Sequence, residues 1–70
     1  MGDKILKNRI EELRTKNEIT QEELALKMEV SRQTISSLEN GKYNPSIFLA
    51  YKLSKFFGMP IEDLFIFEEQ

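Results

Sequence analysis

Residues 20–41 read TQEELALKMEVSRQTISSLENG, and they carry the start and stop signals of two helices. Thr20 and Glu23 can form a capping box, in which each side chain bonds a backbone N–H at the start of a helix. Ser31 is a second capping residue, which restarts a helix after a short break. Gly41 stands where a residue in the left-handed conformation can end a helix at little cost. The stretch therefore predicts two helices joined by a turn of about three or four residues.

The apolar residues of this stretch are spaced so that they line one side of the two helices. They are Leu24, Ala25, Met28, Val30, Ile35 and Leu38. The outer face of the second helix carries polar residues, namely Arg32, Gln33, Thr34, Ser36 and Ser37. These side chains are rich in hydrogen-bond donors and acceptors and include none of the Glu and Lys residues of a merely solvated helix. We interpret the outward face of this helix as a surface that reads a polar partner.

Three further helices are predicted outside this stretch. The first covers residues 3–17, on the helical spacing of Leu6, Ile10 and Leu13. The next covers residues 47–57. A short last helix has Pro60 in its first turn and ends near residue 65. The predicted fold class is all-α, a compact five-helix bundle that forms a single domain over residues 1–70.

The composition narrows the possible chemistry. The chain has 70 residues, 40% of them hydrophobic and 31% charged, and it contains neither cysteine nor histidine. These absences exclude disulfides, thiolate or imidazole metal sites, and the usual nucleophile and base of hydrolytic enzymes. The sequence also has no Gly-rich phosphate loop and no evident small-molecule site, so we expect no cofactor, no metal ion and no enzymatic activity.

The sequence gives no sign of a membrane segment. No apolar run approaches the roughly 20 residues that a membrane-spanning helix needs. The N-terminus, Met1-Gly2-Asp3-Lys4, leads into a charged stretch and not into the apolar region of a signal peptide. We therefore expect a cytoplasmic protein with no membrane partner.

The charge is unevenly distributed along the chain. The formal net charge is −2 and the isoelectric point is about 5.1, although nucleic-acid binding normally depends on basic side chains that neutralise phosphates. Residues 30–45 carry a local charge of +1 from Arg32, Lys42 and Glu39, whereas residues 46–70 carry −2. A face that meets phosphates must therefore be local, and we expect only modest affinity for non-specific DNA.

Three runs of the sequence resemble the phage-repressor and Cro-type helix-turn-helix family. They are Thr20–Ala25, Val30–Ser36 and Leu38–Lys42, and the likeness extends over about residues 4–65. The resemblance implies a bundle of the lambda-repressor-like type, with the helix-turn-helix at residues 20–41. It also implies that double-stranded DNA is the partner, bound in the major groove by a homodimer on a pseudo-palindromic operator. No effector module is evident, so the expected function is a transcriptional regulator that represses by covering a promoter.

The resemblance assigns DNA contacts residue by residue. The base-contacting positions are Arg32, Gln33 and Ser37, with Ser36 as a weaker candidate. The phosphate-contacting positions are Gln21, Thr34, Asn40, Lys42 and Tyr43. Arg32 can pair with guanine and Gln33 with adenine, and each such contact discriminates between bases by about 1–3 kcal/mol. Gln21 is also expected to brace the second helix of the motif.

Two structural features follow from the same resemblance. The family pairs an arginine of its first helix with the glutamate of a Leu-Glu-Asn run, which predicts an ion pair between Arg14 and Glu39. The family usually has glycine in its turn at the position that Glu29 occupies here. We therefore expect a positive φ at Glu29, which costs on the order of 1 kcal/mol for a residue with a Cβ.

The C-terminal tail, residues 64–70, opens with more apolar residues in a row than one small core can take up. Exposed apolar patches often mark interfaces. We therefore assign three of them to a dimer contact, Leu64, Ile66 and Phe67. The alternative is that the tail folds back over the first helix and covers Ile5 and Leu6.

A different function is compatible with this tail. The chain could be a protein-binding module, or the antitoxin of a toxin–antitoxin pair, in which the apolar tail engages a partner protein. DNA binding would then be secondary. Co-purification with an unrelated small protein would favour this alternative.

Overall fold

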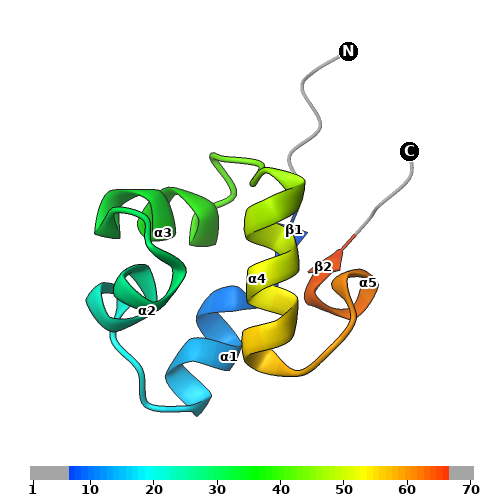
Figure 1. Cartoon of the computed structure of the whole chain (residues 1–70), viewed down its shortest axis with the longest axis horizontal. Helices are drawn as coiled ribbons and strands as arrows, with labels where there is room; N and C mark the ends of the chain where they lie inside the picture. Colours follow the sequence, from blue (N-terminus) through cyan, green and yellow to red (C-terminus); the bar gives the residue numbers. More distant parts are fainter. Residues whose placement is uncertain (1–6, 67–70) are drawn as a thin grey trace.

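Five helices and a two-stranded ribbon make up residues 7–66, which are the residues that the computed structural model describes. The elements in chain order are β1 (Lys7–Asn8), α1 (Ile10–Lys16), α2 (Gln21–Met28), α3 (Arg32–Glu39), α4 (Ile47–Phe57), α5 (Ile61–Leu64) and β2 (Phe65–Ile66). Figure 1 shows α2 and α3 at one end, α4 upright in the middle, and α5 with β2 at the other end. The predicted helical fold class and its five helices are confirmed.

The first helix begins later than its apolar spacing predicts. α1 begins at Ile10, and the expected start at residue 3 is wrong because Lys7 and Asn8 are extended. β1 pairs antiparallel with β2, and the register joins Lys7 to Ile66 and Asn8 to Phe65. Residues 3–6 of the predicted helix lie outside the described residues. The structure is therefore a helical bundle with a small ribbon that ties the two ends of the described chain together.

Hydrogen bonds of the ribbon explain where α1 begins. The backbone N–H of Arg9 donates to the carbonyl oxygen of Leu64 at 3.0 Å. The side-chain Oδ1 of Asn8 accepts from the N–H of Ile10 at 3.0 Å. The first N–H groups of a helix have no partner within it. Here Leu64, the last residue of α5, and the Asn8 side chain supply those partners, so the helix begins at Ile10.

Capping side chains fix the helix-turn-helix as the sequence predicts. Thr20 Oγ1 accepts from the N–H of Glu23 at 3.0 Å, and Glu23 Oε1 accepts from the N–H of Thr20 at 2.8 Å. Ser31 Oγ accepts from the N–H of Thr34 at 3.1 Å, and Gly41 has a φ of 72°. These local signals place α2 and α3 at their predicted positions.

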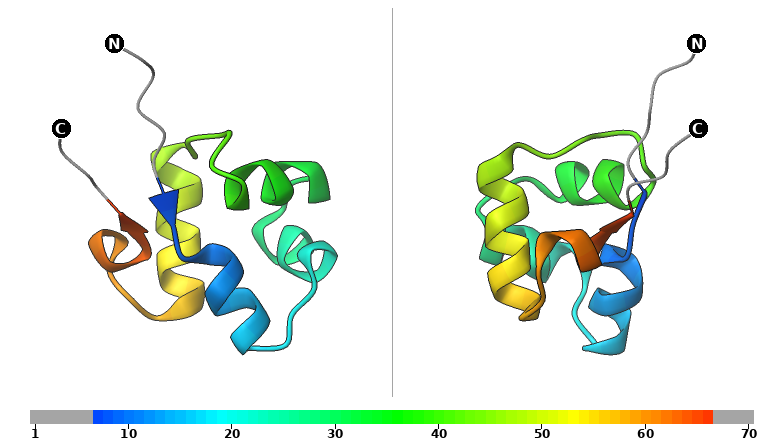
Figure 2. Two further views of the ribbon diagram at one scale, coloured as in Figure 1. Left: turned by 180° about the vertical axis from the view of Figure 1, so that it is seen from behind. Right: turned by 90° about the vertical axis from the view of Figure 1, so that its right-hand side faces the viewer.

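The core lies where the helices meet. Its largest fully buried side chains are Ile10, Leu24, Ile35, Leu38, Leu53, Leu64 and Phe65. The right-hand view of Figure 2 shows α4 on one outer side of the molecule and α1 with β1 on the opposite side. No helix within residues 7–66 has the length and apolar character to cross a membrane.

The turn between α2 and α3 contains the strained residue that the sequence predicts. Glu29 has φ 63° and ψ 42°, the left-handed conformation. The N–H of Glu29 bonds the Leu26 carbonyl at 3.2 Å, and the N–H of Val30 bonds the Ala25 carbonyl at 3.0 Å. This is the hydrogen-bond pattern of a Schellman helix end, in which glycine is the preferred residue. Glu18, with φ 58°, is a second left-handed residue, and the sequence does not predict it.

Replacing Glu29 with glycine is expected to raise the free energy of unfolding by up to about 1 kcal/mol, because glycine adopts this conformation without a Cβ penalty. The variant loses an ion pair between Glu29 Oε1 and Lys52 Nζ at 3.6 Å, but the Glu29 side chain is 83% exposed. Such pairs contribute only about 0–1 kcal/mol. Thermal melting should show a midpoint several degrees higher, roughly 4–8 °C per kcal/mol in a domain of this size.

The matched control for this prediction is Glu22→Gly, an exposed position inside α2 with ordinary helical geometry. Glycine there should lower the free energy of unfolding by about 1 kcal/mol. An unchanged or lower melting midpoint for Glu29→Gly would contradict the strain at this turn.

Candidate nucleic-acid interface

The outward side of α3 presents the polar residues that the sequence singles out. Arg32 and Gln33 are exposed in the first turn of the helix, and Ser36 and Ser37 are partly exposed one turn further on. Ile35 and Leu38 lie on the opposite side and are fully buried. We call Arg32, Gln33, Ser36 and Ser37 the reading face. The buried side of the helix holds these residues in place. Within residues 7–66, the side chains of Arg32 and Gln33 form no hydrogen bond that an interacting base would have to break first.

Among residues 7–66, the phosphate-contacting candidates surround this face. Thr34 is partly exposed, and its hydroxyl lies 2.9 Å from the hydroxyl of Ser31. Asn40, Lys42 and Tyr43 are exposed where α3 ends and the chain turns toward α4. The candidates therefore lie at both ends of α3, as a helix that enters a groove between two phosphate backbones requires. Their contacts with DNA remain predictions.

Glu39, at the last turn of α3, is the centre of a buried polar network. Arg14 donates from Nε to Glu39 Oε2 at 2.6 Å and from Nη2 to Oε1 at 3.2 Å. Gln21 Nε2 donates to the same Oε1 at 2.9 Å, and Arg14 Nη1 donates to the carbonyl of Ile19 at 2.8 Å. The side chains of Arg14 and Glu39 are only 11% and 2% exposed. The ion pair expected between Arg14 and Glu39 is thus present.

This network fixes the position of α3 relative to the rest of the domain. Arg14 comes from α1, Gln21 from the first turn of α2 and Glu39 from α3, so three helices share one carboxylate. The hydrogen bond with Glu39 raises the pKa of the Arg14 guanidinium, against the opposing effect of burial. Charge-assisted bonds of this bidentate type are strong and geometrically specific. The first residue of α2 therefore braces the reading face, as expected of Gln21.

Two further residues position the helix-turn-helix and were not predicted. Asn8 Nδ2 donates to the carbonyl of Leu38 at 2.9 Å, so β1 holds the C-terminal end of α3. Lys52 Nζ, from α4, donates to the carbonyl of Met28 at 2.7 Å and so holds the C-terminal end of α2. Both contacts go to carbonyl oxygens in the last turn of a helix, where partners within the helix are lacking, and the Leu38 carbonyl also accepts the N–H of Gly41 at 3.1 Å. No spacing rule in the sequence connects residues so far apart.

The C-terminal segment only partly matches the dimer surface that the sequence predicts. Leu64 is fully buried, and Phe65 is 2% exposed. The assignment of Leu64 is corrected, because its side chain is enclosed by the core of its own chain. Ile66 is 41% exposed in β2, and Phe67 lies outside the described residues. Pairing of β2 with β1 folds this segment back toward the start of α1, while Ile5 and Leu6 also lie outside the described residues.

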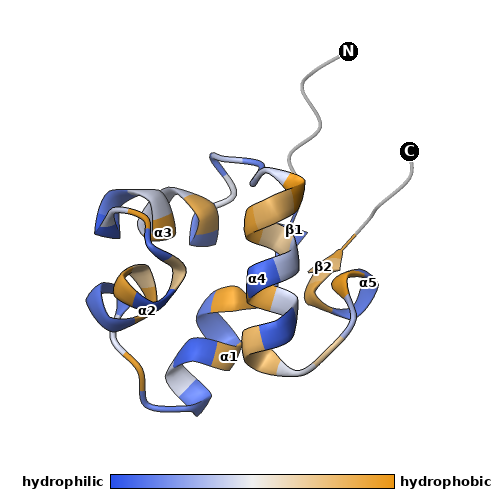
Figure 3. Cartoon of the chain, viewed as in Figure 1, coloured by the Kyte–Doolittle hydropathy of each residue, from blue (hydrophilic) through white to orange (hydrophobic). Residues whose placement is uncertain are grey.

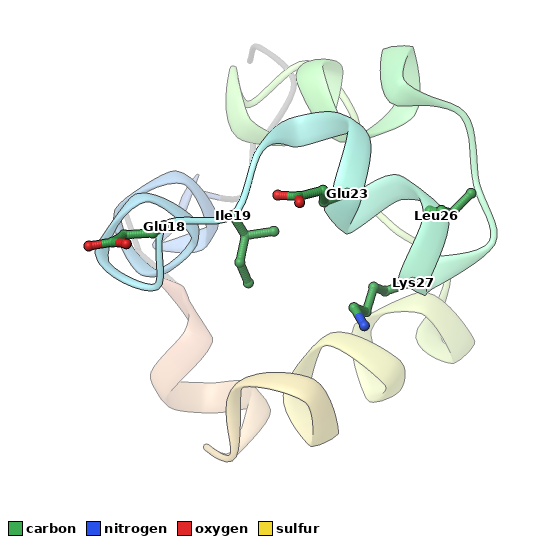
Figure 4. Close-up of a pocket in the computed structure, with 5 residues that line it drawn as sticks. All are labelled: Glu18, Ile19, Glu23, Leu26 and Lys27. Carbon is green, nitrogen blue, oxygen red and sulfur yellow. The ribbon is translucent and has the colours of Figure 1, made fainter.

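An open pocket of about 520 Å³ lies beside α2, on the side away from α3 (Figure 4). It is lined by Glu18, Ile19, Glu23, Leu26 and Lys27. The Glu23 carboxylate already accepts the N–H of Thr20, and Glu18 points away from Ile19 in Figure 4. Residues 7–66 contain no cluster of three or more side chains that could hold a metal ion. The reading face is therefore the stronger candidate site.

Comparison with known proteins decides the family. The family model described as helix-turn-helix matches residues 10–64, which include all of the core except Phe65, the network around Glu39 and the reading face. The chain belongs to the XRE-type helix-turn-helix family of transcriptional regulators. DNA binding is a property of this family. The helical fold and the helix-turn-helix at residues 20–41 are consistent with it.

Relatives of the same size support this membership. The chain is 53% identical over 64 residues to an uncharacterized HTH-type transcriptional regulator of Methanocaldococcus jannaschii, covering 91% of this chain and 97% of the relative. It is 55% identical over 65 residues to one of Archaeoglobus fulgidus, covering 93% of each. The crystal structure of the restriction-modification controller protein C.AhdI from Aeromonas hydrophila superposes with a TM-score of 0.70 and 29% identity. That match covers 79% of this chain and 83% of the other.

Proposed function

We propose that this helix-turn-helix regulator is a sequence-specific repressor, which places α3 in the major groove of a pseudo-palindromic operator and binds as a homodimer. Arg32 and Gln33 read base edges, with Ser37 and Ser36 beside them. Gln21, Thr34, Asn40, Lys42 and Tyr43 contact the flanking phosphates and set the register of α3 in the groove.

The observation that carries this proposal is the contrast between the two sides of α3. One side is held by buried Ile35 and Leu38 and by the bonds of Glu39 to two other helices. The other side exposes Arg32 and Gln33 in the first turn. A site that must distinguish bases needs donors and acceptors held in a fixed geometry. A rigid helix with a polar outer side supplies that geometry.

The charge distribution supports binding through specific contacts more than through general attraction to DNA. Arg32 and Lys42 are the basic residues of residues 30–45, so few phosphates can be neutralised by one copy. Affinity then depends on base contacts and on the pairing of two copies on one operator. This is the reason for a dimer in the proposal.

Selection of binding sites from a random double-stranded DNA library tests the proposal. The wild-type chain should select a palindromic site, and Arg32→Ala or Gln33→Ala should relax the preference at one or two positions in each half-site. The loss at those positions should be about 1–3 kcal/mol, or roughly 5- to 150-fold in relative affinity. The comparison variant is Lys42→Ala, which should weaken binding to all sequences by a similar factor.

Uniform loss of binding in all three variants, with no position relaxed, would contradict the base-reading assignment. The selected site then allows a direct test of repression. Placed across a promoter, it should make transcription by purified polymerase fall as the protein is added. A rise in transcription would identify an activator.

A further inference from the structure

The N-terminal half of α4 exposes three large apolar side chains on one side. Ile47, Phe48 and Tyr51 are 84%, 69% and 52% exposed, and we call them the α4 patch. The opposite side of the same helix carries Leu49, Ala50 and Leu53, which are buried. In Figure 3 the upper end of α4 is coloured as hydrophobic, and no other element of the described chain passes in front of it.

A helix with this pattern is normally covered on both sides. Of the residues of α4, all but Lys52, Ser54 and Lys55 are apolar. A helix that is apolar all round is typical of a buried position, whereas a surface helix keeps its apolar residues to one stripe. The described part of the chain covers only the inner side of α4. The N-terminal half of α4 therefore offers an apolar outer side that a second surface can cover.

We propose that the α4 patch is the surface through which two copies of this chain associate, so that a dimer forms through α4 and not through Leu64. The inference rests on the proposed function in one respect, because the partner copy is the one that a palindromic operator requires. It moves the dimer contact from the C-terminal tail to a helix that directly follows the DNA-facing segment around Lys42.

The size of the patch fits a second copy. Side chains of this kind bury about 150–250 Å² each, so the α4 patch offers on the order of 300–400 Å² of apolar surface. A stable interface covers about 800 Å² on each partner, with an apolar centre and a polar rim. The patch has the size of such a centre. A two-fold axis brings a patch against itself, and an apolar patch is complementary to its own copy.

The charges around the patch favour the same occupant. Lys52 Nζ lies 5.3 Å from the centre of the Phe48 ring, and Lys55 Nζ lies 5.6 Å from that of Tyr51. Lys52 also bonds the Met28 carbonyl and pairs with Glu29, so Lys55 supplies the positive charge at the rim of the patch, and a partner should combine apolar surface with an acidic group at its edge. A second copy provides both, since α5, which packs against α4, exposes Glu62 and Asp63.

The position of the patch also suits two reading helices on one DNA. The chain passes from the end of α3 through residues 40–46 into the first turn of α4, so the patch lies next to the phosphate-contacting segment. Pairing at this point places the two copies of that segment near the two-fold axis and one α3 on each side of it. Half-sites separated by about one helical turn of DNA need this arrangement.

Sedimentation of the full chain across a range of concentrations, without DNA, tests the inference. Wild type should sediment as a dimer, and Phe48→Glu should weaken self-association by about 100-fold or more, as expected for a charge introduced into an apolar interface centre. The matched control is Leu26→Glu, because Leu26 is 81% exposed on α2, outside the patch. It should associate like wild type. Circular dichroism should show that both variants keep the helical fold.

A second measurement does not depend on the fold tolerating a charge. The chain has no cysteine, so single-cysteine variants can be joined only at the new site. Phe48→Cys and Tyr51→Cys should form covalent dimers with a short thiol cross-linker, and Leu26→Cys should not. A wild-type chain that sediments as a monomer, or a Phe48→Glu variant that dimerises like wild type, would overturn the inference.

The result separates this inference from the proposed function. If the protein selects no DNA sequence but Phe48→Glu abolishes the dimer, the α4 patch is the interface and the DNA proposal fails. If the selected palindrome is bound and Phe48→Glu leaves the dimer intact, the DNA proposal holds and the interface lies elsewhere. Dimerisation that is lost in a variant at Ile66 but kept in Phe48→Glu would return the contact to β2.

Discussion

Replacement of Glu39 by alanine is expected to lower the free energy of unfolding by about 3–5 kcal/mol, because it leaves the nearly buried Arg14 guanidinium without its counter-ion. Arg14 is 11% exposed and would keep only its bond to the carbonyl of Ile19 among those found in the described chain. Gln21 would lose its partner as well. A domain of this size is stabilised by roughly 4–10 kcal/mol in total. Thermal melting should therefore show a midpoint lower by at least about 15 °C.

Two control variants show whether the effect comes from removing a carboxylate or from leaving Arg14 without its partner. Glu22→Ala removes an exposed carboxylate of α2 and should change the free energy of unfolding by no more than about 0.5 kcal/mol. The double variant Arg14→Met with Glu39→Leu removes both charges and should recover part of the lost stability, since apolar residues can replace a buried ion pair. A small effect of Glu39→Ala alone would mean that water readily solvates Arg14.

Replacement of Leu64 by alanine is expected to lower the free energy of unfolding by about 2–5 kcal/mol, because Leu64 is fully buried and its loss leaves a cavity in the core. Urea unfolding measures the change. The comparison variant is Ile66→Ala, two residues further on and 41% exposed, which should cost less than about 1 kcal/mol. If Leu64→Ala kept wild-type stability while altering the sedimentation coefficient, Leu64 would belong to an interface after all.

The helix-turn-helix could be predicted because its signals are local. Thr20 and Glu23 bond across a single helical turn, and Ser31 caps the helix that follows it. Such contacts depend on residues three apart, so spacing in the sequence is sufficient to find them. The positive φ of Glu29 could be predicted for a related reason, since the family resemblance identifies a position where glycine is usual.

The errors arise where residues distant in the sequence meet. The spacing of Leu6, Ile10 and Leu13 continues a helical pattern through residues that pair with β2 instead. Strands of two residues have no alternation that could mark them. Leu64 is a core residue because α5 turns it inward, and a run of four apolar residues does not show which of them face the core.

The candidate site shows the same division between local and distant signals. The polar outer side of α3 could be recognised from its residues alone. The contacts of Asn8 with α3 and of Lys52 with α2 could not, because each depends on how whole elements pack. The α4 patch lies between these cases. Its two apolar sides are visible in the sequence of residues 47–57, but only the fold shows which side is covered.

The pairing of β1 with β2 has a consequence for how this domain can be built into larger proteins. Lys7 and Ile66 are partners across the ribbon, so the chain enters and leaves the described domain at neighbouring points, about 5 Å apart as in any strand pair. A module fused at either end would start from the same corner of the domain. Because Asn8 ties that corner to the end of α3, both fusions would begin close to the end of α3. A circular permutant that joins these ends and opens the chain at residues 17–20 should retain the fold.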